Sequence, residues 1–314
     1  MGENKKMNGT VIAYIQIGLA MMIVGSSVVF GKLITSSFPV FLASELRFII
    51  ATVILLPLLL IREKKVPAIK SKFLLILFLQ AFTGVFMFNI FMLYGLKYTT
   101  AIEAGIITST LPAVIGLFSF ILLKEKLTVK KGFGIAFAVL GVLCFNLVGN
   151  SLDGNNSLKG NLLIFGAVLA ETLFIIIGKS LSNKVTPLTI STMMSIFGLI
   201  MFLPFAIYEA IGFDFSNVGV GAWINILYFG IIVTVVAFLL MYQGLSKVPA
   251  NSTGVLTSLI PISSIFLSFF ILKEQIYLTH LLGMILVLIA ILFISKESSV
   301  NKELEVKTST VEAG

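Results

Sequence analysis

A single acidic residue, Glu171, stands near the middle of the long apolar segment 160–180. If this segment crosses a bilayer as a helix, an acid at its centre costs about 2.5–3.5 kcal/mol and must face other helices and find a partner there. We interpret Glu171 as a carboxylate that binds a proton or the amine of a substrate. The alternative is a protonated acid that is hydrogen-bonded to a neighbouring helix.

Two copies of a Thr-Ser-x-x-Pro element lie in apolar segments far apart in the chain. The first copy contains Thr108, Ser109 and Pro112, and the second contains Thr257, Ser258 and Pro261. A proline within a helix has no N–H, so the carbonyl four residues earlier, here that of Thr108 or Thr257, loses its donor. With the hydroxyl groups, these carbonyls could coordinate a polar substrate or a cation at membrane depth. The alternative is a kink in each helix that a nearby side chain or water satisfies.

Three further charged residues lie within apolar segments or at their edges. Arg47 and Glu45 are two positions apart, so they do not face each other on one helix. Arg47 could instead pair with Glu171 as a tie between helices, or extend toward the membrane surface. Glu103 stands in the first turn of the segment 100–123, where the positive end of the helix dipole favours a carboxylate.

Four uncharged polar residues at membrane depth complete the candidate substrate site: Ser26, Asn89, Tyr228 and Tyr242. Any one of them is more often an interhelical hydrogen bond, worth about 0.6 kcal/mol, than a ligand. The only histidine, His280, and the only cysteine, Cys144, are far apart in the sequence. The sequence therefore predicts neither catalytic residues nor a metal or cofactor site.

The elements that must position these residues are membrane helices. Of the 314 residues, 58% are hydrophobic and 11% are charged, and a soluble protein of this composition would expose large aggregating patches. A helix needs about 20 residues to cross the hydrocarbon core. Ten apolar segments of roughly this length are present, at 11–32, 39–61, 73–96, 100–123, 130–148, 160–180, 187–208, 221–244, 251–272 and 279–295. We predict an all-α membrane protein with ten transmembrane helices.

The positive charges predict the orientation. The formal net charge is +8, and with the N-terminus inside, 17 of the 22 Lys and Arg residues fall in inner loops or tails against four outside. This asymmetry satisfies the positive-inside rule. We expect a multi-pass protein of the plasma membrane with both termini cytoplasmic. Because the cations lie in short loops rather than on a soluble face, a nucleic-acid partner is excluded.

An internal repeat is visible at an offset of 149 residues. The sequence MLYGLK at Met92–Lys97 recurs as MYQGLS at Met241–Ser246, Pro112 recurs as Pro261, and Glu125 as Glu274. Each half therefore contains five helices, and an odd number inserts the second half in the opposite direction. Inverted repeats of this kind place a substrate site between the halves at the bilayer midplane.

The predicted domain organisation follows from the repeat. It consists of a cytoplasmic tail at 1–10, a first five-helix repeat at 11–148, an outer linker loop at 149–159, a second five-helix repeat at 160–295 and a disordered cytoplasmic tail at 296–314.

The paired motifs resemble the EamA-type drug/metabolite transporter family, in which each repeat ends its fourth helix with a proline, an apolar stretch and an acid. The matching residues are Pro112 with Glu125, Pro261 with Glu274, Gly25-Ser26 with Lys32, and Pro39 with Arg47. Val24 replaces the tryptophan usual in the first helix, and its counterpart in the second half is Glu171. The resemblance covers nearly the whole chain. It implies two inverted five-helix repeats around a central cavity and the export of amino acids or related metabolites.

We therefore predict a secondary transporter that exports small polar metabolites by alternating access. A lipid or polyisoprenoid flippase of the same fold is the alternative. A membrane-embedded enzyme is less favoured, because no nucleophile stands beside a base. The expected partners are a small-molecule substrate, a coupling proton or sodium ion and the lipid bilayer, with the chain a monomer or dimer.

Overall fold

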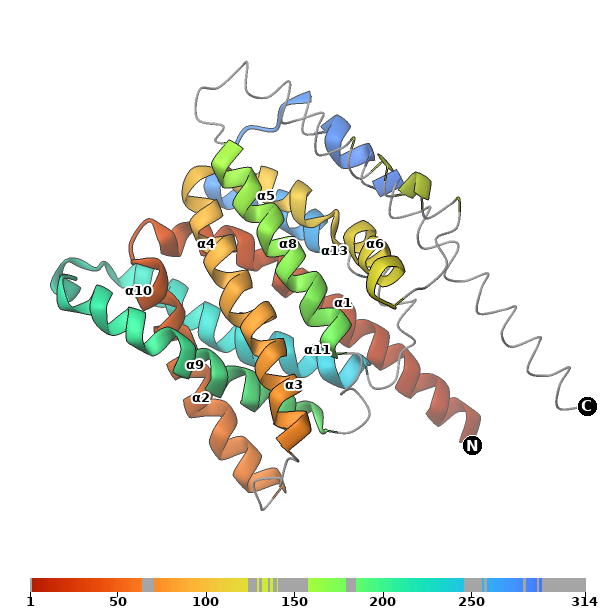
Figure 1. Cartoon of the computed structure of the whole chain (residues 1–314), viewed down its shortest axis with the longest axis horizontal. Coiled ribbons are helices and arrows are strands. Elements are labelled where there is room, and N and C mark those ends of the chain that lie inside the picture. Colours follow the sequence, from red (N-terminus) through yellow and green to blue (C-terminus); the bar gives the residue numbers. More distant parts are fainter. Residues whose placement is uncertain are drawn as a thin grey trace, which may run out of the picture.

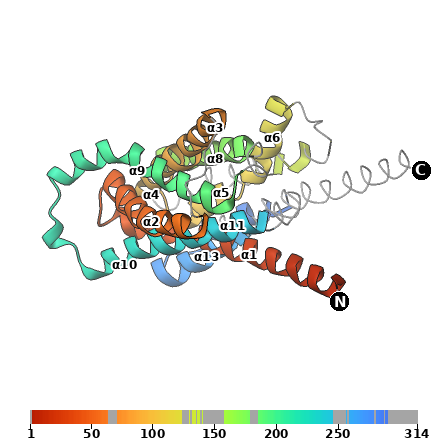
Figure 2. The same cartoon turned by 90° about the horizontal axis from the view of Figure 1, so that it is seen from below.

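The computed structural model is a bundle of long helices (Figures 1 and 2). It describes residues 2–63, 71–123, 158–178, 185–245 and 259–278, with short pieces between 129 and 140, at 256 and between 281 and 289. These residues contain helices and no strand, which confirms the predicted all-α class. Most of the expected fifth and tenth helices, the linker loop and the C-terminal tail lie outside the described residues.

Seven helical stretches of the described chain are long and apolar enough to cross a membrane. They are α1 (Gly2–Thr35), α2 (Val40–Glu63), the run α3, η1 and α4 (Ser71–Ala81, Phe82–Met87, Phe88–Tyr98), the pair α5 and α6 (Ala101–Thr108, Leu111–Leu123), α8 (Leu158–Gly178), α9 (Pro187–Ile211) and the run α10, η3 and α11 (Val220–Tyr228, Phe229–Val236, Ala237–Leu245). A shorter apolar helix follows, α13 (Leu259–Leu267) with η4 (Ser268–Leu272). The segments η1, η3 and η4 are π-helical, and η2 (Phe215–Asn217) is a single 3-10 turn.

Side-chain contacts define two ends of the bundle. At the end that we call the Lys32 end, the ammonium of Lys32 on α1 donates to the carbonyl of Thr99, which follows α4. Thr99 Oγ1 also lies 2.6 Å from Asn161 Oδ1, near the start of α8. At the opposite end, the Glu63 end, the last residue of α2 accepts a hydrogen bond from the hydroxyl of Thr186, the N-cap of α9.

These contacts show that the two halves run in opposite directions. The first helix of the first repeat, α1, ends at the Lys32 end, whereas the first helix of the second repeat, α8, begins there. Likewise α2 begins at the Lys32 end, but α9 ends there, where Glu209 Oε2 accepts from the N–H of Leu42 at 2.8 Å. The predicted inversion of the repeats is therefore present in the described helices.

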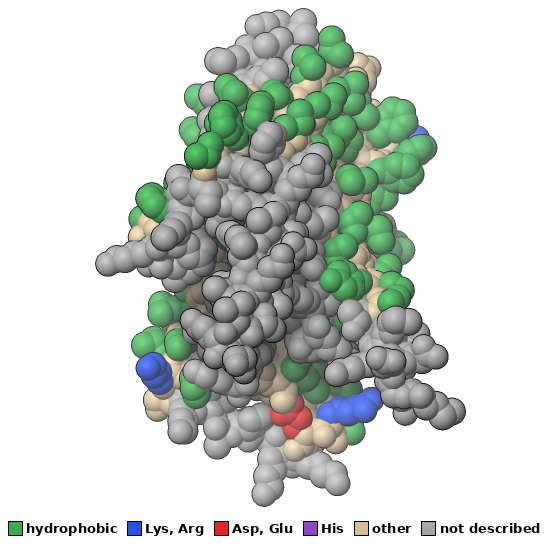
Figure 3. All heavy atoms as spheres, turned by 90° about the vertical axis from the view of Figure 1, so that its right-hand side faces the viewer, with side chains coloured by type: hydrophobic (Ala, Val, Ile, Leu, Met, Phe, Trp, Pro, Cys, Tyr) green, Lys and Arg blue, Asp and Glu red, His purple; other side chains and the backbone are tan. Residues whose placement is uncertain are grey.

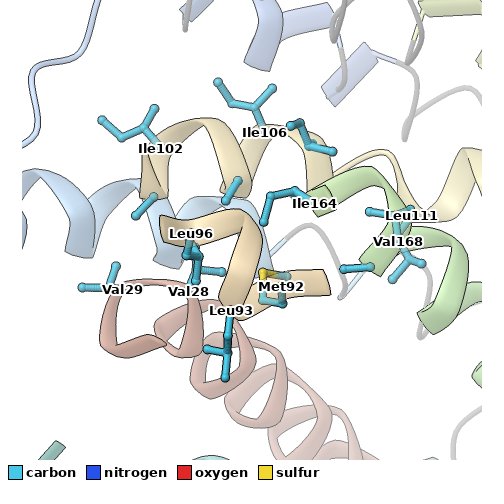
Figure 4. Packing of buried hydrophobic residues seen from close by; sticks show 14 of the residues in the cluster. Val28, Val29, Met92, Leu93, Leu96, Ile102, Ile106, Leu111, Ile164 and Val168 are labelled. Carbon is cyan, nitrogen blue, oxygen red and sulfur yellow. The ribbon is translucent and has the colours of Figure 1, made fainter. Parts of the chain in front are cut away.

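The largest apolar cluster joins helices of both repeats (Figure 4). It contains Val28 and Val29 of α1, Met92, Leu93 and Leu96 of α4, Ile102 and Ile106 of α5, Leu111 of α6, and Ile164 and Val168 of α8. A Cβ added at Gly95 would lie 2.5 Å from Ile164 Cδ1. The absence of a side chain there lets α4 and α8 approach closely, as membrane helices do at small residues.

A second close approach joins α1 to α13. A Cβ added at Gly25 would lie 1.9 Å from Ser263 Oγ and 2.4 Å from the carbonyl oxygen of Ile260. Ser263 Oγ also donates to the carbonyl of Met22 at 3.1 Å. Because a side chain at position 25 would collide with the backbone of α13, only glycine permits this contact.

Large apolar side chains cover the outside of the bundle. One face of the molecule is mostly hydrophobic in its described part, with few charged side chains (Figure 3). Ile61 of α2 and Tyr208 of α9, for example, are 74% and 82% exposed. Such a surface would aggregate in water, but it is the expected boundary of a helix bundle with lipid.

Candidate functional site

A hydrogen bond joins the two repeats between α1 and α10. Ser26 Oγ and Tyr228 Oη are 2.7 Å apart, and Ser26 Oγ also donates to the carbonyl of Ile23 at 2.6 Å. The ring of Tyr228 stacks on that of Phe30, one turn beyond Ser26, with centroids 4.0 Å apart. Two of the predicted site residues, from opposite halves of the chain, are therefore in direct contact.

Arg47 of α2 is buried beside this contact, with only 6% of its surface exposed. Its Nη1 donates to Asn89 Oδ1 of α4 at 2.7 Å. Its guanidinium carbon lies 4.6 Å from the ring centroid of Phe48 and 4.8 Å from that of Phe229, the residue after Tyr228. Arg47 Nε has no hydrogen-bond partner among the residues that the structure describes. Asn89 in turn donates from Nδ2 to the carbonyl of Val85 at 2.5 Å.

Two of the three partners of Arg47, Asn89 and Phe229, belong to spans that contain a π-helical segment. Asn89 lies two residues after η1, and Phe229 is the first residue of η3. The repeat offset of 149 maps η1 onto 231–236, which lies within η3. A π turn leaves a carbonyl without its usual donor, and such turns are frequent at functional sites. Thr234 Oγ1 in η3 donates to the carbonyl of Phe229 at 2.9 Å.

Glu171 lies on α8 at nearly the depth of Asn89. A Cβ added at Gly84 would lie 2.6 Å from that of Phe174, so Glu171, three residues earlier on the antiparallel α8, is within about one turn of the level of Asn89. Glu171 is half-buried. Tyr242 of α11 lies within electrostatic range of it, and the buried hydroxyl of Tyr242 has no partner in the described chain.

The predicted pairing of Arg47 with Glu171 is wrong for this structure. Among the described residues Arg47 bonds only Asn89, and no hydrogen bond or ion pair reaches Glu171. Arg47 does not extend to the membrane surface either. The amide of Asn89 and two aromatic rings surround the guanidinium inside the bundle. These contacts stabilise its charge without exposure to water.

Glu45 is also buried, at 4% exposure, and within the described chain neither of its carboxylate oxygens has a hydrogen-bond partner. It is separated from Arg47 by two positions, which point in directions about 200° apart on a helix. Glu103 has a different environment at the Lys32 end. Its N–H donates to the hydroxyl of Thr100, the N-cap of α5, at 3.1 Å, and its carboxylate accepts from the hydroxyl of Thr99.

The first Thr-Ser-x-x-Pro element breaks its helix rather than kinking it. α5 ends at Thr108 and α6 begins at Leu111, so Pro112 stands in the first turn of a new helix, where a missing N–H is tolerated. The hydroxyl of Thr108 donates to the carbonyl of Gly105 at 3.0 Å, and that of Ser109 to the carbonyl of Ile106 at 2.5 Å. Both hydroxyls are thus engaged within their own helix.

In the second copy, Pro261 is the third residue of α13 and is buried, also within a first turn. Thr257 and Ser258 lie outside the described residues. In the part of the chain that the structure describes, no three His, Cys, Asp or Glu side chains gather in a way that could hold a metal ion.

Sequence reasoning missed two contributors to this site. Phe229 and Phe48 cover the guanidinium of Arg47, but in a chain with 28 phenylalanines no pattern distinguishes these two. The hydrogen bond from Lys32 and the partners of Glu274, which are the N–H groups of Ala101 and Ile102 at 2.9 Å, were also not predicted. The repeated Lys-Glu pairs were the only signal for Glu274.

Comparison with known proteins agrees with this architecture. The family model of the EamA-like transporter family matches residues 11–147 and 158–296. An uncharacterized transporter of Bacillus subtilis, YetK, is 49% identical over 286 residues, which cover 89% of this chain and 87% of that protein. An uncharacterized transporter of Archaeoglobus fulgidus is 28% identical and covers 82% of this chain and 89% of its own length. A solved crystal structure with 17% identity has a TM-score of 0.65 and covers 91% of this chain and 97% of its own, which supports the fold.

An all-α bundle with inverted halves and a polar contact between them is the architecture of a membrane transporter. The chain belongs to the EamA-like transporter family.

Proposed function

We propose that this protein is a secondary transporter that moves small polar metabolites, such as amino acids or related compounds, out of the cell by alternating access. The observation that supports this proposal is the polar cluster formed by Ser26, Tyr228, Arg47 and Asn89. Its members come from α1, α2, α4 and α10, and therefore from both repeats. In inverted-repeat transporters the substrate binds at such an interface, and one repeat moves against the other around it.

We also propose which residue couples transport to protons and which end of the protein faces the cytoplasm. Glu171 lies at the depth of the cluster without a described partner, which suits a group that takes up and releases a coupling proton. The Glu63 end faces the cytoplasm of the cell, and the Lys32 end faces outward across the plasma membrane, as the distribution of cations favours. Thr108, Ser109 and the break before Pro112 lie beside α8 and would line the path of the substrate.

The test is flux of a radiolabelled amino-acid mixture and a metabolite panel in proteoliposomes, with and without an imposed pH gradient. We expect uptake or exchange of at least one polar compound by the wild-type protein and none by empty vesicles. Movement of fluorescent lipid probes without flux of any metabolite would reject the proposal in favour of a flippase.

Two matched variants test whether flux depends on the polar cluster. Tyr228→Phe removes only the hydroxyl that contacts Ser26 and keeps the ring stacked on Phe30, and we expect flux to fall at least several-fold. Tyr208→Phe makes the same change on a side chain that is 82% exposed, and flux should be unchanged. Equal flux in both variants would exclude the Ser26–Tyr228 contact from transport.

A further inference from the structure

The charge of Arg47 is not balanced by any acidic side chain in the described chain. The residue is 94% buried, it takes part in no ion pair, and its single hydrogen bond goes to the neutral amide of Asn89. A buried cation without a counter-charge is expensive, so it persists only where a function requires it. The rings of Phe48 and Phe229 offset part of this cost, since a desolvated cation over an aromatic ring is attracted to it.

One edge of the guanidinium is buried, and its Nε makes no hydrogen bond with any described residue. The guanidinium carbon lies over the rings of Phe48 and Phe229, and Asn89 accepts from Nη1. The five N–H donors of arginine lie in one plane, and the edge that contains Nε, which has no partner, is a fork that matches the two oxygens of a carboxylate.

The single positive charge of Arg47 favours a substrate group with a single negative charge. Arg47 contributes one positive charge, and Lys32, which is partly buried, is bonded to the carbonyl of Thr99 at the Lys32 end. A carboxylate would neutralise the guanidinium, whereas a phosphate dianion would leave an uncompensated negative charge at membrane depth. Glu45 and Glu171 do not compete for the site, because neither contacts Arg47.

We infer that Arg47 is the docking point for the carboxylate of the transported compound. This inference rests on the proposed function and names its substrate class: small monoanionic or zwitterionic carboxylates. Asn89 holds the guanidinium in place, and the Ser26–Tyr228 pair borders the same site through Phe229. Because Arg47 Nε is covered in this conformation, the carboxylate enters when Phe229 moves with η3, and its binding is thereby linked to the movement of the second repeat.

NMR of labelled arginine can test this inference, because the chain has few arginines. The chain contains only Arg47 and Arg62, so full-length protein with isotope-labelled arginine in detergent gives two Nε–H signals in NMR, and Arg62→Lys assigns them. The probes are L-leucine with L-leucinamide, 3-phenylpropanoate with 3-phenylpropanamide, and phenyl phosphate, each at millimolar concentration. We expect the carboxylate of at least one pair to shift the Arg47 signal while its amide does not, with the Arg62 signal unchanged.

Three outcomes would overturn the inference: an Arg47 signal that no carboxylate moves, one that amides move equally, or one that responds to phenyl phosphate alone. Asn89→Asp supplies a second test that does not depend on removing the arginine. It places a carboxylate oxygen within 2.7 Å of Nη1 but loses the donor to the carbonyl of Val85. Because the new carboxylate neutralises the guanidinium, the variant should no longer respond to carboxylate probes. An undiminished response in this variant would contradict the inference.

The flux assay distinguishes an error in the role of Arg47 from an error in the proposed function. If the proteoliposomes transport only compounds without an anionic group, and Arg47→Gln transports them at the wild-type rate, the protein is still a transporter but Arg47 is not its carboxylate site. If no compound crosses, the proposed function itself fails.

Discussion

The carboxylate of Glu274 caps the N-terminus of a helix in the other half of the chain. Its two oxygens accept from the N–H groups of Ala101 and Ile102, each at 2.9 Å, across 173 and 172 residues of sequence. The first N–H groups of a helix lack intrahelical partners, and a negative charge there is favoured by the helix dipole. Glu274 therefore ties α13 to α5 and closes the Lys32 end of the bundle.

Replacing Glu274 by Ala should loosen this closure. We expect a loss of about 1 kcal/mol in stability, the usual worth of a cap, and faster modification of a cysteine introduced at position 101 in a Cys144→Ser background. Thermal unfolding and the rate of labelling by a thiol reagent measure the two effects. Gln275→Ala, which changes the exposed neighbour, is the control, and equal labelling rates in the two variants would contradict a role for Glu274 in closure.

Gly25→Ala should destabilise the contact between α1 and α13. The new methyl group would lie 1.9 Å from Ser263 Oγ and 2.4 Å from a backbone oxygen, and overpacking of this kind costs about 1–3 kcal/mol. Gly18→Ala is the matched control on the same helix, because its nearest neighbour is 3.5 Å away. Its unfolding temperature should equal or exceed that of the wild type, since alanine favours a helix over glycine by about 1 kcal/mol. A Gly25→Ala protein as stable as Gly18→Ala would show that the helices are not packed as described.

Glu171→Gln should reduce transport more than it reduces folded yield. The substitution keeps the size of the side chain and removes its ability to carry a proton, so we expect flux to lose its response to an imposed pH gradient. Glu63→Gln serves as a control, because Glu63 ties α2 to Thr186 and Thr189 at the end of the bundle. It should lower stability modestly and leave the response to the gradient intact. Normal coupled flux at normal yield in Glu171→Gln would remove Glu171 from the mechanism.

Pro112→Ala should alter transport by allowing α5 and α6 to join into one helix. A restored N–H at position 112 could bond the carbonyl of Thr108, which would stiffen the segment beside α8. The control is Pro57→Ala in α2, an exposed proline inside a continuous helix, where the change should leave flux unchanged. Wild-type kinetics in both variants would show that the break is not needed for transport.

The repeat in the sequence was sufficient to predict the inverted architecture. The recurrence of MLYGLK at an offset of 149 residues, together with an odd number of helices per half, implies opposite insertion, and the contacts of Lys32 and Glu63 agree. The same recurrence marked Glu274 through its counterpart Glu125. Its partners could not be predicted, because they are backbone N–H groups of another helix and have no side-chain signature.

The environment of Arg47 was predictable only in part. Burial within the bundle follows from the position of a cation inside an apolar segment, but an acid and an amide are both able to accept from a guanidinium. The choice of Asn89 over Glu171 depends on how α2 and α4 are rotated about their axes. The π-helical segment η1 precedes α4 and contributes to the rotation of α4. Its extra residue per turn leaves no trace in a segment where nearly every residue is apolar.

The π-helical segment η1 makes the orientation of Asn89 sensitive to the length of its span. An inserted residue in a helix turns everything beyond it by about 100°, so the orientation of Asn89 depends on the number of residues in Phe82–Met87 as much as on their identity. Deleting one of them would relax η1 to an ordinary helix and swing the amide away from the guanidinium, although composition and hydropathy would hardly change. Shortening this stretch by one residue should therefore be more harmful than most substitutions within it.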